Sequence, residues 1–152
     1  MATAVITGAN RGLGLEMAKQ YAAQGWDVIA TAREPEKAEE LNAIDKVTVM
    51  PLDAAEDSSI ETFAEQLGGR PVDLFTSKAA VNQAWHSLAQ QWQDEDLTLA
   101  MLHPGWVQTD MGGENADLTP QESVEGMRSV IEGLDRNKNG KFYDYSGREI
   151  PW

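Results

Sequence analysis

The sequence predicts an α/β fold in which helices cover both faces of a mostly parallel sheet of about six strands. Apolar runs of strand length alternate with helical patterns along the chain, which is typical of βαβ units. The chain has 152 residues, 41% of them hydrophobic, which is enough to bury one core. No internal repeat or low-complexity linker interrupts the pattern, so we expect a single domain, 1–152.

The first half of the chain holds four of the predicted strands. An apolar run at 2–6 predicts a short buried strand. A helix follows at 12–24, where apolar residues share one face at a spacing of four, and Gly25 closes it. The other elements of this half are strands at 27–31, 46–52 and 72–75, a short acidic helix at 35–42 that starts at a proline, and a helix at 58–67.

The second half begins with a predicted long helix, 76–92, whose apolar stripe indicates a core face. It follows the fourth strand with essentially no loop, although strand-to-helix loops usually take about two to six residues. Thr119 is expected to cap a helix at 120–134, with Glu122 in the capping-box position. The remaining strands are predicted at 97–102 and 141–145.

Charge and composition narrow the classes of partner. The net charge of −13 argues against binding to nucleic acid or to an anionic membrane surface. No apolar run has the length of a membrane span, and the N-terminus lacks a signal-peptide pattern, so we expect a cytoplasmic location. Because the chain has no cysteine, disulfides, thiolate metal ligands and a cysteine nucleophile are excluded.

A glycine-rich turn at 7–14 lies between the first predicted strand and the first helix. Gly8 permits a tight turn, Gly12 lets the backbone approach a pyrophosphate, and Gly14 allows close packing of the helix. The start of the helix offers N–H donors and the positive end of its dipole. This context predicts a Rossmann-like dinucleotide site, with a ligand-free glycine turn as the alternative.

The spacing of these glycines resembles that of the short-chain dehydrogenase/reductase family. The resemblance implies that the phosphates are held by Gly8, Asn10, Arg11, Gly12, Leu13 and Gly14.

Arg33 directly follows the second predicted strand. An acid there would bind a ribose hydroxyl, whereas a cation suits a 2′-phosphate, so Arg33, helped by Arg11, predicts NADP in preference to NAD. A solvated surface arginine is the alternative. Asp53 matches the family's adenine-contacting aspartate, and a capping or turn role is the alternative for it.

The resemblance continues through the second half. Residues 76–82 resemble the start of the family's active-site helix, where Lys78 would bind the nicotinamide ribose and lower the pKa of a tyrosine four residues earlier. Segments at 139–143 and 150–152 resemble the C-factor or carbonyl-reductase-like branch. Residues 104–111 resemble the loop that closes over the nicotinamide carboxamide, which implies contacts from Pro104, Gly105, Val107 and Thr109.

The catalytic residues of that family are absent. Leu74, not tyrosine, stands four residues before Lys78, and the strand that carries the family's serine is missing. The chain is identified as a family member shortened by one helix–strand unit between Phe75 and Thr76, and the loopless junction supports this independently. We expect the strand order 3-2-1-4-5-6. Loss of a covering helix predicts exposed apolar surface and a homo-oligomer.

The leading hypothesis is an NADP(H)-binding domain with little or no carbonyl or alcohol oxidoreductase turnover. A positioned proton donor is worth about 10²- to 10⁴-fold in rate, and Lys78 lacks its tyrosine partner. One alternative is an active NADPH-dependent reductase of a small carbonyl substrate. Another is a non-catalytic scaffold or self-association module.

Two further patterns are assigned structural roles. Residues 135–140 match the first half of a calcium loop, but Ser146 holds the twelfth place, where a bidentate carboxylate is needed, so a turn is the better interpretation. His86 and His103 have no metal-ligand spacing, and packing or surface roles are expected for both. No metal site is predicted.

Overall fold

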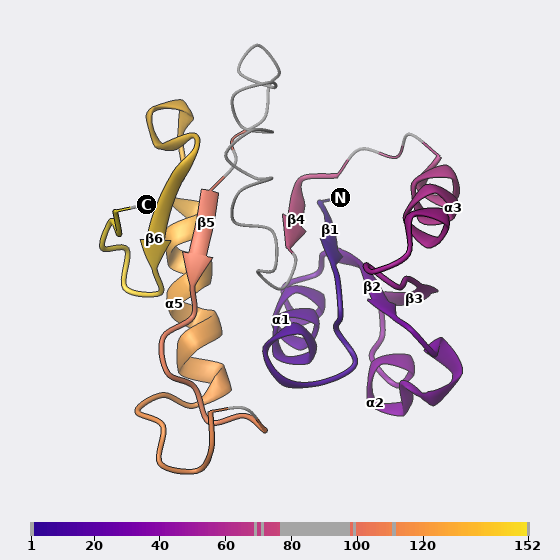
Figure 1. Cartoon of the computed structure of the whole chain (residues 1–152), viewed down its shortest axis with the longest axis horizontal. Coiled ribbons are helices and arrows are strands. Elements are labelled where there is room, and N and C mark those ends of the chain that lie inside the picture. Colours follow the sequence, from indigo (N-terminus) through magenta and orange to yellow (C-terminus); the bar gives the residue numbers. More distant parts are fainter. Residues whose placement is uncertain are drawn as a thin grey trace. The chain divides into compact units, whose positions relative to one another are not determined.

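The computed structural model describes residues 2–68, 70, 72–76, 98, 100–110 and 112–151. These residues form two compact units, Met1–Lys78 and Ala79–Trp152, and each unit is described by itself (Figure 1). The single domain expected from the sequence stays a prediction.

The first unit is built on a four-stranded parallel sheet. Its strand order is β3-β2-β1-β4, which confirms the first four positions of the predicted order. Ile6 pairs with Ala30 on one side and with Thr76 on the other, so β1 is central. The chain moves outward from β1 and then crosses back to β4, which places a topological switch point between β1 and β4. The strands are β1 (Thr3–Ile6), β2 (Asp27–Ala32), β3 (Val47–Pro51) and β4 (Leu74–Thr76).

Two helices cover opposite faces of this sheet, as expected for a doubly wound fold. From α3 (Asp57–Leu67), Phe63 packs with Val5 and Ile29 in a buried apolar cluster. From α1 (Gly12–Ala23), the sulfur of Met17 lies 3.7 Å from the hydroxyl of Thr76, which is paired with Ile6. Successive strand residues point to opposite faces of a sheet, so Val5 and Ile6 lie on different faces. Because α3 packs against Val5 and α1 contacts the strand partner of Ile6, the two helices cover opposite faces.

The acidic helix predicted at 35–42 is interrupted. It consists of a 3-10 turn, η1 (Pro35–Lys37), and a short helix, α2 (Glu39–Asn42). Ala38 lies between them with ψ at 58°, outside the helical range, and it is buried. The side-chain amide of Asn42 donates to the carbonyl of Pro35 (2.9 Å), which closes the segment in this broken form.

The fourth strand lies further along the chain than predicted. It spans 74–76 instead of 72–75, and Thr76 ends the strand instead of opening a helix. The carboxylate of Asp73 accepts a hydrogen bond from the amide of Thr3 (2.8 Å), and the Asp73 amide donates to the Thr3 carbonyl (3.0 Å). These long-range bonds set the register. The rest of the predicted 76–92 helix lies outside the described residues.

The second unit has a two-stranded parallel sheet and one long helix. The strands are β5 (Ala100–His103) and β6 (Lys141–Asp144), joined through α5 (Pro120–Glu132) and a 3-10 turn, η2 (Arg136–Lys138). The six strands and their parallel pairing confirm the predicted α/β class, and the predicted neighbours five and six do pair. The predicted pairing of strands four and five stays a prediction.

The start of α5 confirms the predicted capping box. The hydroxyl of Thr119 accepts from the amide of Glu122 (3.2 Å), and the carboxylate of Glu122 accepts from the amide of Thr119 (2.9 Å). The backbone hydrogen bond from Thr119 is the main reason that the pKa of Glu122 is lowered. The two side chains thus accept hydrogen bonds from backbone amides at the start of the helix, which have no acceptor within the helix itself.

Apolar exposure is limited in the part of the chain that the structure describes. Ile60 and Trp106 are the large hydrophobic side chains exposed there. No helix among the described residues is long and apolar enough to cross a membrane. The homo-oligomer expected from the sequence stays a prediction.

Candidate nucleotide-binding site

The glycine loop after β1 is held against the end of β2. The amide of Gly8 donates to the hydroxyl of Thr31 (3.3 Å), and the amide of Ala9 donates to the carbonyl of Thr31 (2.9 Å). Gly8 and Gly12 have φ angles of 61° and 57°, in the left-handed region that glycine adopts without strain. The turn that the sequence predicts is therefore present, and two of its glycines are required by backbone conformation.

Gly14 brings the first turn of α1 into contact with this loop. A Cβ at Gly14 would lie 2.8 Å from the carbonyl oxygen of Gly8 and 2.9 Å from the Cα of Ala9. Real Cβ atoms essentially never approach backbone that closely. The close approach expected for Gly14 is therefore found, although it is made to the loop and not to a strand.

The N-terminus of α1 carries no competing side chain. Arg11 occupies the N-cap position in an extended conformation, no side chain caps the helix, and its first turn holds no acid. Since the first amides of a helix lack intrahelical partners, and the helix dipole adds roughly half a positive charge there, this end suits an anion. Asn10 and Arg11 are exposed beside it, and Leu13 is half-buried.

Arg33 lies at the end of β2, one strand away from the glycine loop. It is exposed and makes no hydrogen bond or ion pair within the described part of the chain. Two of the acids that follow Arg33 form ion pairs with lysines: Glu34 pairs with Lys37, and Glu40 pairs with Lys19 at 3.0 Å. The side-chain hydrogen bond that Lys37 donates to Glu34 is the main cause of the raised pKa of Lys37.

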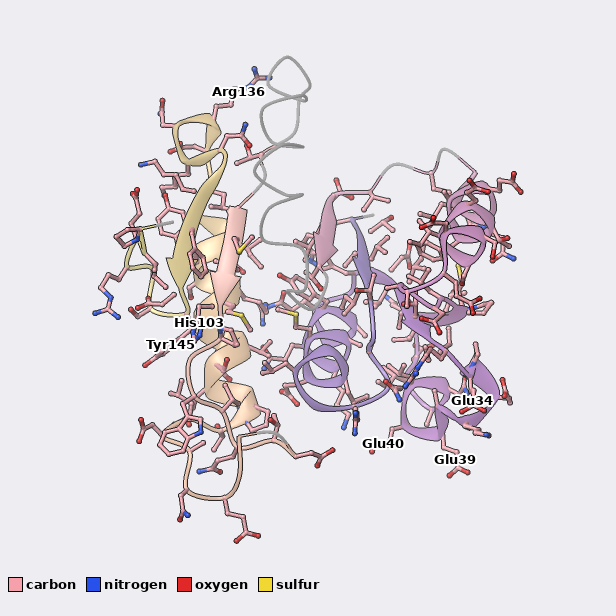
Figure 2. All side chains as sticks on the ribbon, in the orientation of Figure 1. Glu34, Glu39, Glu40, His103, Arg136 and Tyr145 are labelled. Carbon is pink, nitrogen blue, oxygen red and sulfur yellow. The ribbon has the colours of Figure 1, made fainter. Side chains whose placement is uncertain are left out.

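Figure 2 shows the acidic side chains Glu34, Glu39 and Glu40 gathered around η1 and α2. Glu34 and Glu40 pair with Lys37 and Lys19, and the Arg33 guanidinium has no ion pair within the described part of the chain, so it is available for an external anion.

Asp53 lies near the end of β3. The glycine loop, Arg33 and Asp53 therefore follow three adjacent parallel strands, β1, β2 and β3, at one edge of the sheet. Its carboxylate accepts from the amide of Ala55 (3.0 Å), and its own amide donates to the hydroxyl of Ser59 (2.9 Å). The turn role that the sequence left open for Asp53 is therefore present. Contact with adenine stays a prediction.

In the second unit, the segment after β5 is a compact loop fixed at its start. The buried hydroxyl of Ser123 donates to the carbonyl of Pro104 (2.6 Å), and the amide of Gly105 donates to Nδ1 of His103 (3.0 Å). The side chains of His103 and Tyr145 lie at the carboxyl ends of β5 and β6 (Figure 2). His103 thus has the structural role expected of it, whereas His86 lies outside the described residues.

The Val107 carbonyl and the Thr109 hydroxyl form hydrogen bonds within this loop. The Thr109 hydroxyl donates to the Val107 carbonyl (3.4 Å) and accepts from the amide of Gly112 (3.3 Å). A Cβ at Gly112 would overlap the Val107 carbonyl oxygen, so that oxygen is covered by the loop backbone. The expectation that Pro104, Gly105, Val107 and Thr109 hold a nicotinamide stays a prediction.

Three residues that no sequence pattern singled out organise this unit: Ser123, Asp144 and Tyr145. Tyr145 lies between two glycines, because Cβ atoms at Gly105 and Gly126 would each be 3.0 Å from its ring. No local sequence pattern distinguishes a serine in a helix or a tyrosine after a strand that makes long-range contacts of this kind from one that makes none.

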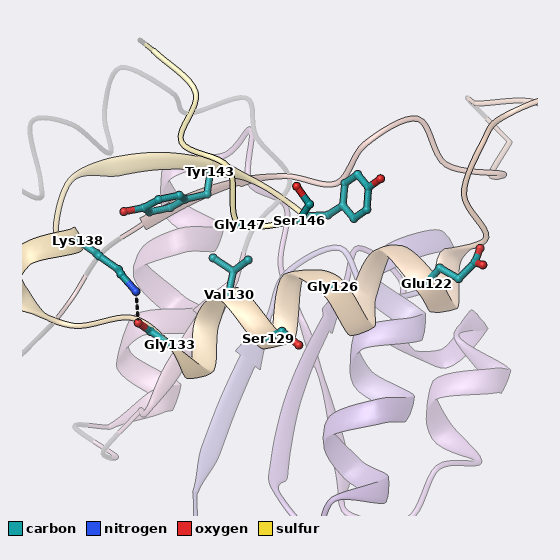
Figure 3. Close-up of a pocket in the computed structure, with 10 residues that line it drawn as sticks. Glu122, Gly126, Ser129, Val130, Gly133, Lys138, Tyr143, Ser146 and Gly147 are labelled. Carbon is teal, nitrogen blue, oxygen red and sulfur yellow. Dashed lines mark hydrogen bonds between the residues drawn. The ribbon is translucent and has the colours of Figure 1, made fainter.

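A groove of about 460 Å³ lies over α5 and the end of β6 (Figure 3). The amine of Lys138, the cation that lines it, donates to the carbonyl of Gly133 and so closes the helix end. The Lys138 amine is therefore engaged at the end of α5. The groove is lined by Glu122, Gly126, Ser129, Val130, Gly133, Lys138, Tyr143, Tyr145, Ser146 and Gly147.

The segment that resembles a calcium loop forms a turn. The carboxylate of Asp135 accepts from the amide of Asn137 (2.8 Å) and caps η2. This is the turn role favoured by the sequence. Among the residues that the structure describes, no group of three metal-ligating side chains occurs.

The fold and the glycine loop define a Rossmann-like architecture, and comparison with known proteins shows which family it resembles. Residues 2–74 match the short chain dehydrogenase family. The chain is 50% identical to C-signal from Myxococcus xanthus over 76 residues, which are 50% of this chain and 46% of C-signal. It is 30% identical over 120 residues to an uncharacterized oxidoreductase of Schizosaccharomyces pombe, covering 62% of this chain and 47% of that protein. The N-terminal half of the chain is therefore similar to the short-chain dehydrogenase family, and the chain spans about half the length of these relatives.

Solved structures show the same fold at lower identity. The NADPH-bound carbonyl reductase from chicken fatty liver superposes with a TM-score of 0.87 at 21% identity, over 100% of this chain and 99% of that one. A short-chain dehydrogenase/reductase from Burkholderia multivorans with bound NADP gives 0.84 at 24% identity, over 99% of both chains. The mostly parallel Rossmann-like architecture predicted from the sequence is thereby confirmed.

Proposed function

We propose that this chain binds NADP(H) through its first unit and performs little or no carbonyl or alcohol oxidoreductase turnover. One observation carries the proposal: the contact of Gly14 with Gly8 holds an uncapped helix start at the switch point of the sheet, one strand from an unpaired Arg33. Similar folds bound to NADPH or NADP support it.

Each part of the site has a distinct role in this proposal. The loop and the first turn of α1 hold the pyrophosphate by backbone amides, through Gly8, Asn10, Arg11, Gly12, Leu13 and Gly14. Arg33 pairs with the 2′-phosphate, because a guanidinium matches phosphate geometry with two parallel hydrogen bonds. Asp53 lies on the adenine side. Lys78 lies outside the described residues, and its contact with the nicotinamide ribose is carried by the resemblance alone.

The proposed lack of turnover rests on the missing proton donor. NADPH supplies a hydride when bound, and the protein must still deliver a proton to the substrate oxygen. Leu74 stands four residues before Lys78, where the resemblance places a tyrosine, and it pairs with Ala4 inside the sheet. A leucine side chain has no proton to give.

The three tyrosines of the chain have structural roles. Tyr21 is buried and packs edge-on against Trp26 with ring centroids 5.0 Å apart. Tyr143 is buried in β6, and Tyr145 is enclosed by two glycines. None lies on the segment around Lys78.

Isothermal titration with NADPH, with NADH as the control, tests the binding function. We expect saturable binding that prefers NADPH. The same preparation is then assayed for carbonyl-dependent oxidation of NADPH, and we expect none. Turnover that Lys78→Ala abolishes would establish the active reductase instead. Failure to bind either dinucleotide would contradict the proposal and leave the scaffold alternative.

A further inference from the structure

Resting on the proposed function, we propose that the nicotinamide ring adds nothing to binding, which comes from the 2′-phosphoadenosine, the pyrophosphate and the ribose beyond it. The chain therefore does not distinguish NADP⁺ from NADPH, nor either of them from a nicotinamide-free fragment. The ligand class is a 2′-phosphorylated adenine nucleotide with a 5′-diphosphoribose, whether or not that ribose carries a nicotinamide.

The groups proposed to bind the 2′-phosphate and the pyrophosphate all belong to one compact unit. The uncapped start of α1, the glycine loop and the unpaired Arg33 lie within residues 1–78. They act on charged phosphates, and hydrogen bonds with an ionised partner are roughly twice as strong as neutral ones. Most of the binding free energy is therefore expected from the part of the ligand that NADP⁺ and NADPH share.

Two of the groups expected at the nicotinamide carboxamide, the Thr109 hydroxyl and the Val107 carbonyl, are already used. The Thr109 hydroxyl bonds with the Val107 carbonyl and the Gly112 amide, and the Gly112 backbone covers that carbonyl. Binding of a carboxamide at these two groups would exchange existing hydrogen bonds for new ones. A neutral exchange of this kind adds little net affinity.

The test compares three ligands with the full-length chain: NADP⁺, NADPH and 2′-phospho-ADP-ribose, which lacks only the nicotinamide. We expect dissociation constants that agree within about threefold, less than the tenfold difference that marks a substantial added interaction. The titration is made at about 0.15 M salt, where a Debye length of about 8 Å screens attraction between the net negative protein and the cationic ring of NADP⁺.

Binding of either dinucleotide about tenfold or more tightly than 2′-phospho-ADP-ribose would overturn the inference while leaving the proposed function intact. Binding of none of the three would refute the proposed function itself. Arg33→Ala is expected to weaken all three by the same factor, because all carry the 2′-phosphate. A smaller loss for the dinucleotides would show that their 2′-phosphate is held differently from that of the fragment, and would contradict the inference.

Nicotinamide fluorescence provides a second readout. The reduced ring of NADPH is excited directly while the protein is added to saturation. We expect its emission maximum and intensity to remain those of free NADPH, because the ring stays in water. A blue shift with enhanced emission would place the ring in an apolar protein environment and would contradict the inference.

Discussion

The Cα of Gly14 lies so close to the loop before α1 that a Cβ there would be 2.8 Å from the carbonyl oxygen of Gly8. This contact joins the first turn of the helix to the residue that leaves β1. Because both neighbours are backbone atoms, a side chain at Gly14 cannot be accommodated by a rotamer change. The position of the helix start, and with it the candidate anion site, depends on the absence of a Cβ at Gly14.

Gly14→Ala should therefore displace α1 from the loop. We expect the free energy of unfolding to fall by about 1–3 kcal/mol, as for other overpacked contacts, and NADPH affinity to fall with it. Urea denaturation and titration calorimetry measure the two effects. Gly133→Ala is the control, because a Cβ at Gly133 meets its nearest neighbours at 3.6 Å, an ordinary contact. Equal stability of the two variants would contradict the expectation.

Arg33→Ala should reduce the preference for NADPH over NADH. Loss of hydrogen bonds to a charged phosphate is worth about 1.5–3 kcal/mol, or roughly 10- to 100-fold in the dissociation constant for NADPH. The dissociation constant for NADH should change little, because NADH has no 2′-phosphate. Arg70→Ala removes another exposed arginine of the same unit and should alter neither affinity. An unchanged NADPH affinity in Arg33→Ala would leave Arg33 as a solvated surface residue.

Ser123→Ala should loosen the loop that starts at Pro104. The Ser123 hydroxyl is fully buried and donates to the Pro104 carbonyl at 2.6 Å, so its removal leaves that carbonyl without this donor. We expect a loss of about 1–3 kcal/mol in unfolding free energy, together with faster amide exchange in the loop. Ser129→Ala changes an exposed serine on the same helix and should stay within about 0.5 kcal/mol of the parent.

Asp144 should contribute to the acid sensitivity of the second unit. Its carboxylate accepts from the hydroxyl of Ser146 at 2.6 Å and from the amides of Ser146 and Arg148 at 3.0 Å. The side-chain hydrogen bond from Ser146 is the main cause of the lowered pKa of Asp144.

Since the folded pKa lies below the unfolded value of about 3.9, this stabilisation is present above that pH and is lost as the pH falls through the folded pKa. Asp144→Asn should therefore flatten the decline of unfolding free energy below about pH 4, measured by urea denaturation across pH. Asp117→Asn, at an exposed site in the same unit, serves as the control. An unchanged slope in Asp144→Asn would remove this residue from the acid response.

The parts of the fold that depend on neighbours in sequence were predictable. Capping by Thr119 and Glu122 follows from residues three apart, and the glycine turn follows from Gly8 and Gly12, whose left-handed backbone is a local property. The alternation of strands and helices is likewise a local pattern of apolar residues, and it led to the correct class and to the order of the first four strands.

Other features depend on partners far away in the sequence. The start of β4 is set by bonds between Asp73 and Thr3, so apolar patterning placed that strand two residues early. The buried Ala38 interrupts a segment whose local pattern is helical.

For the candidate site, the sequence by itself determined which residue types follow each strand: glycines after β1, a cation after β2 and an acid after β3. Only the tertiary structure decided which of them are available to a ligand. Arg33 is available because Glu34 and Glu40 pair with Lys37 and Lys19, and the second of these pairs joins residues 21 positions apart. The hydroxyl of Thr109 is engaged because the loop backbone folds back on it. Whether a polar side chain can bind a ligand depends on which other side chains and backbone groups lie near it in the folded protein. The order of residue types along the chain does not specify these neighbours.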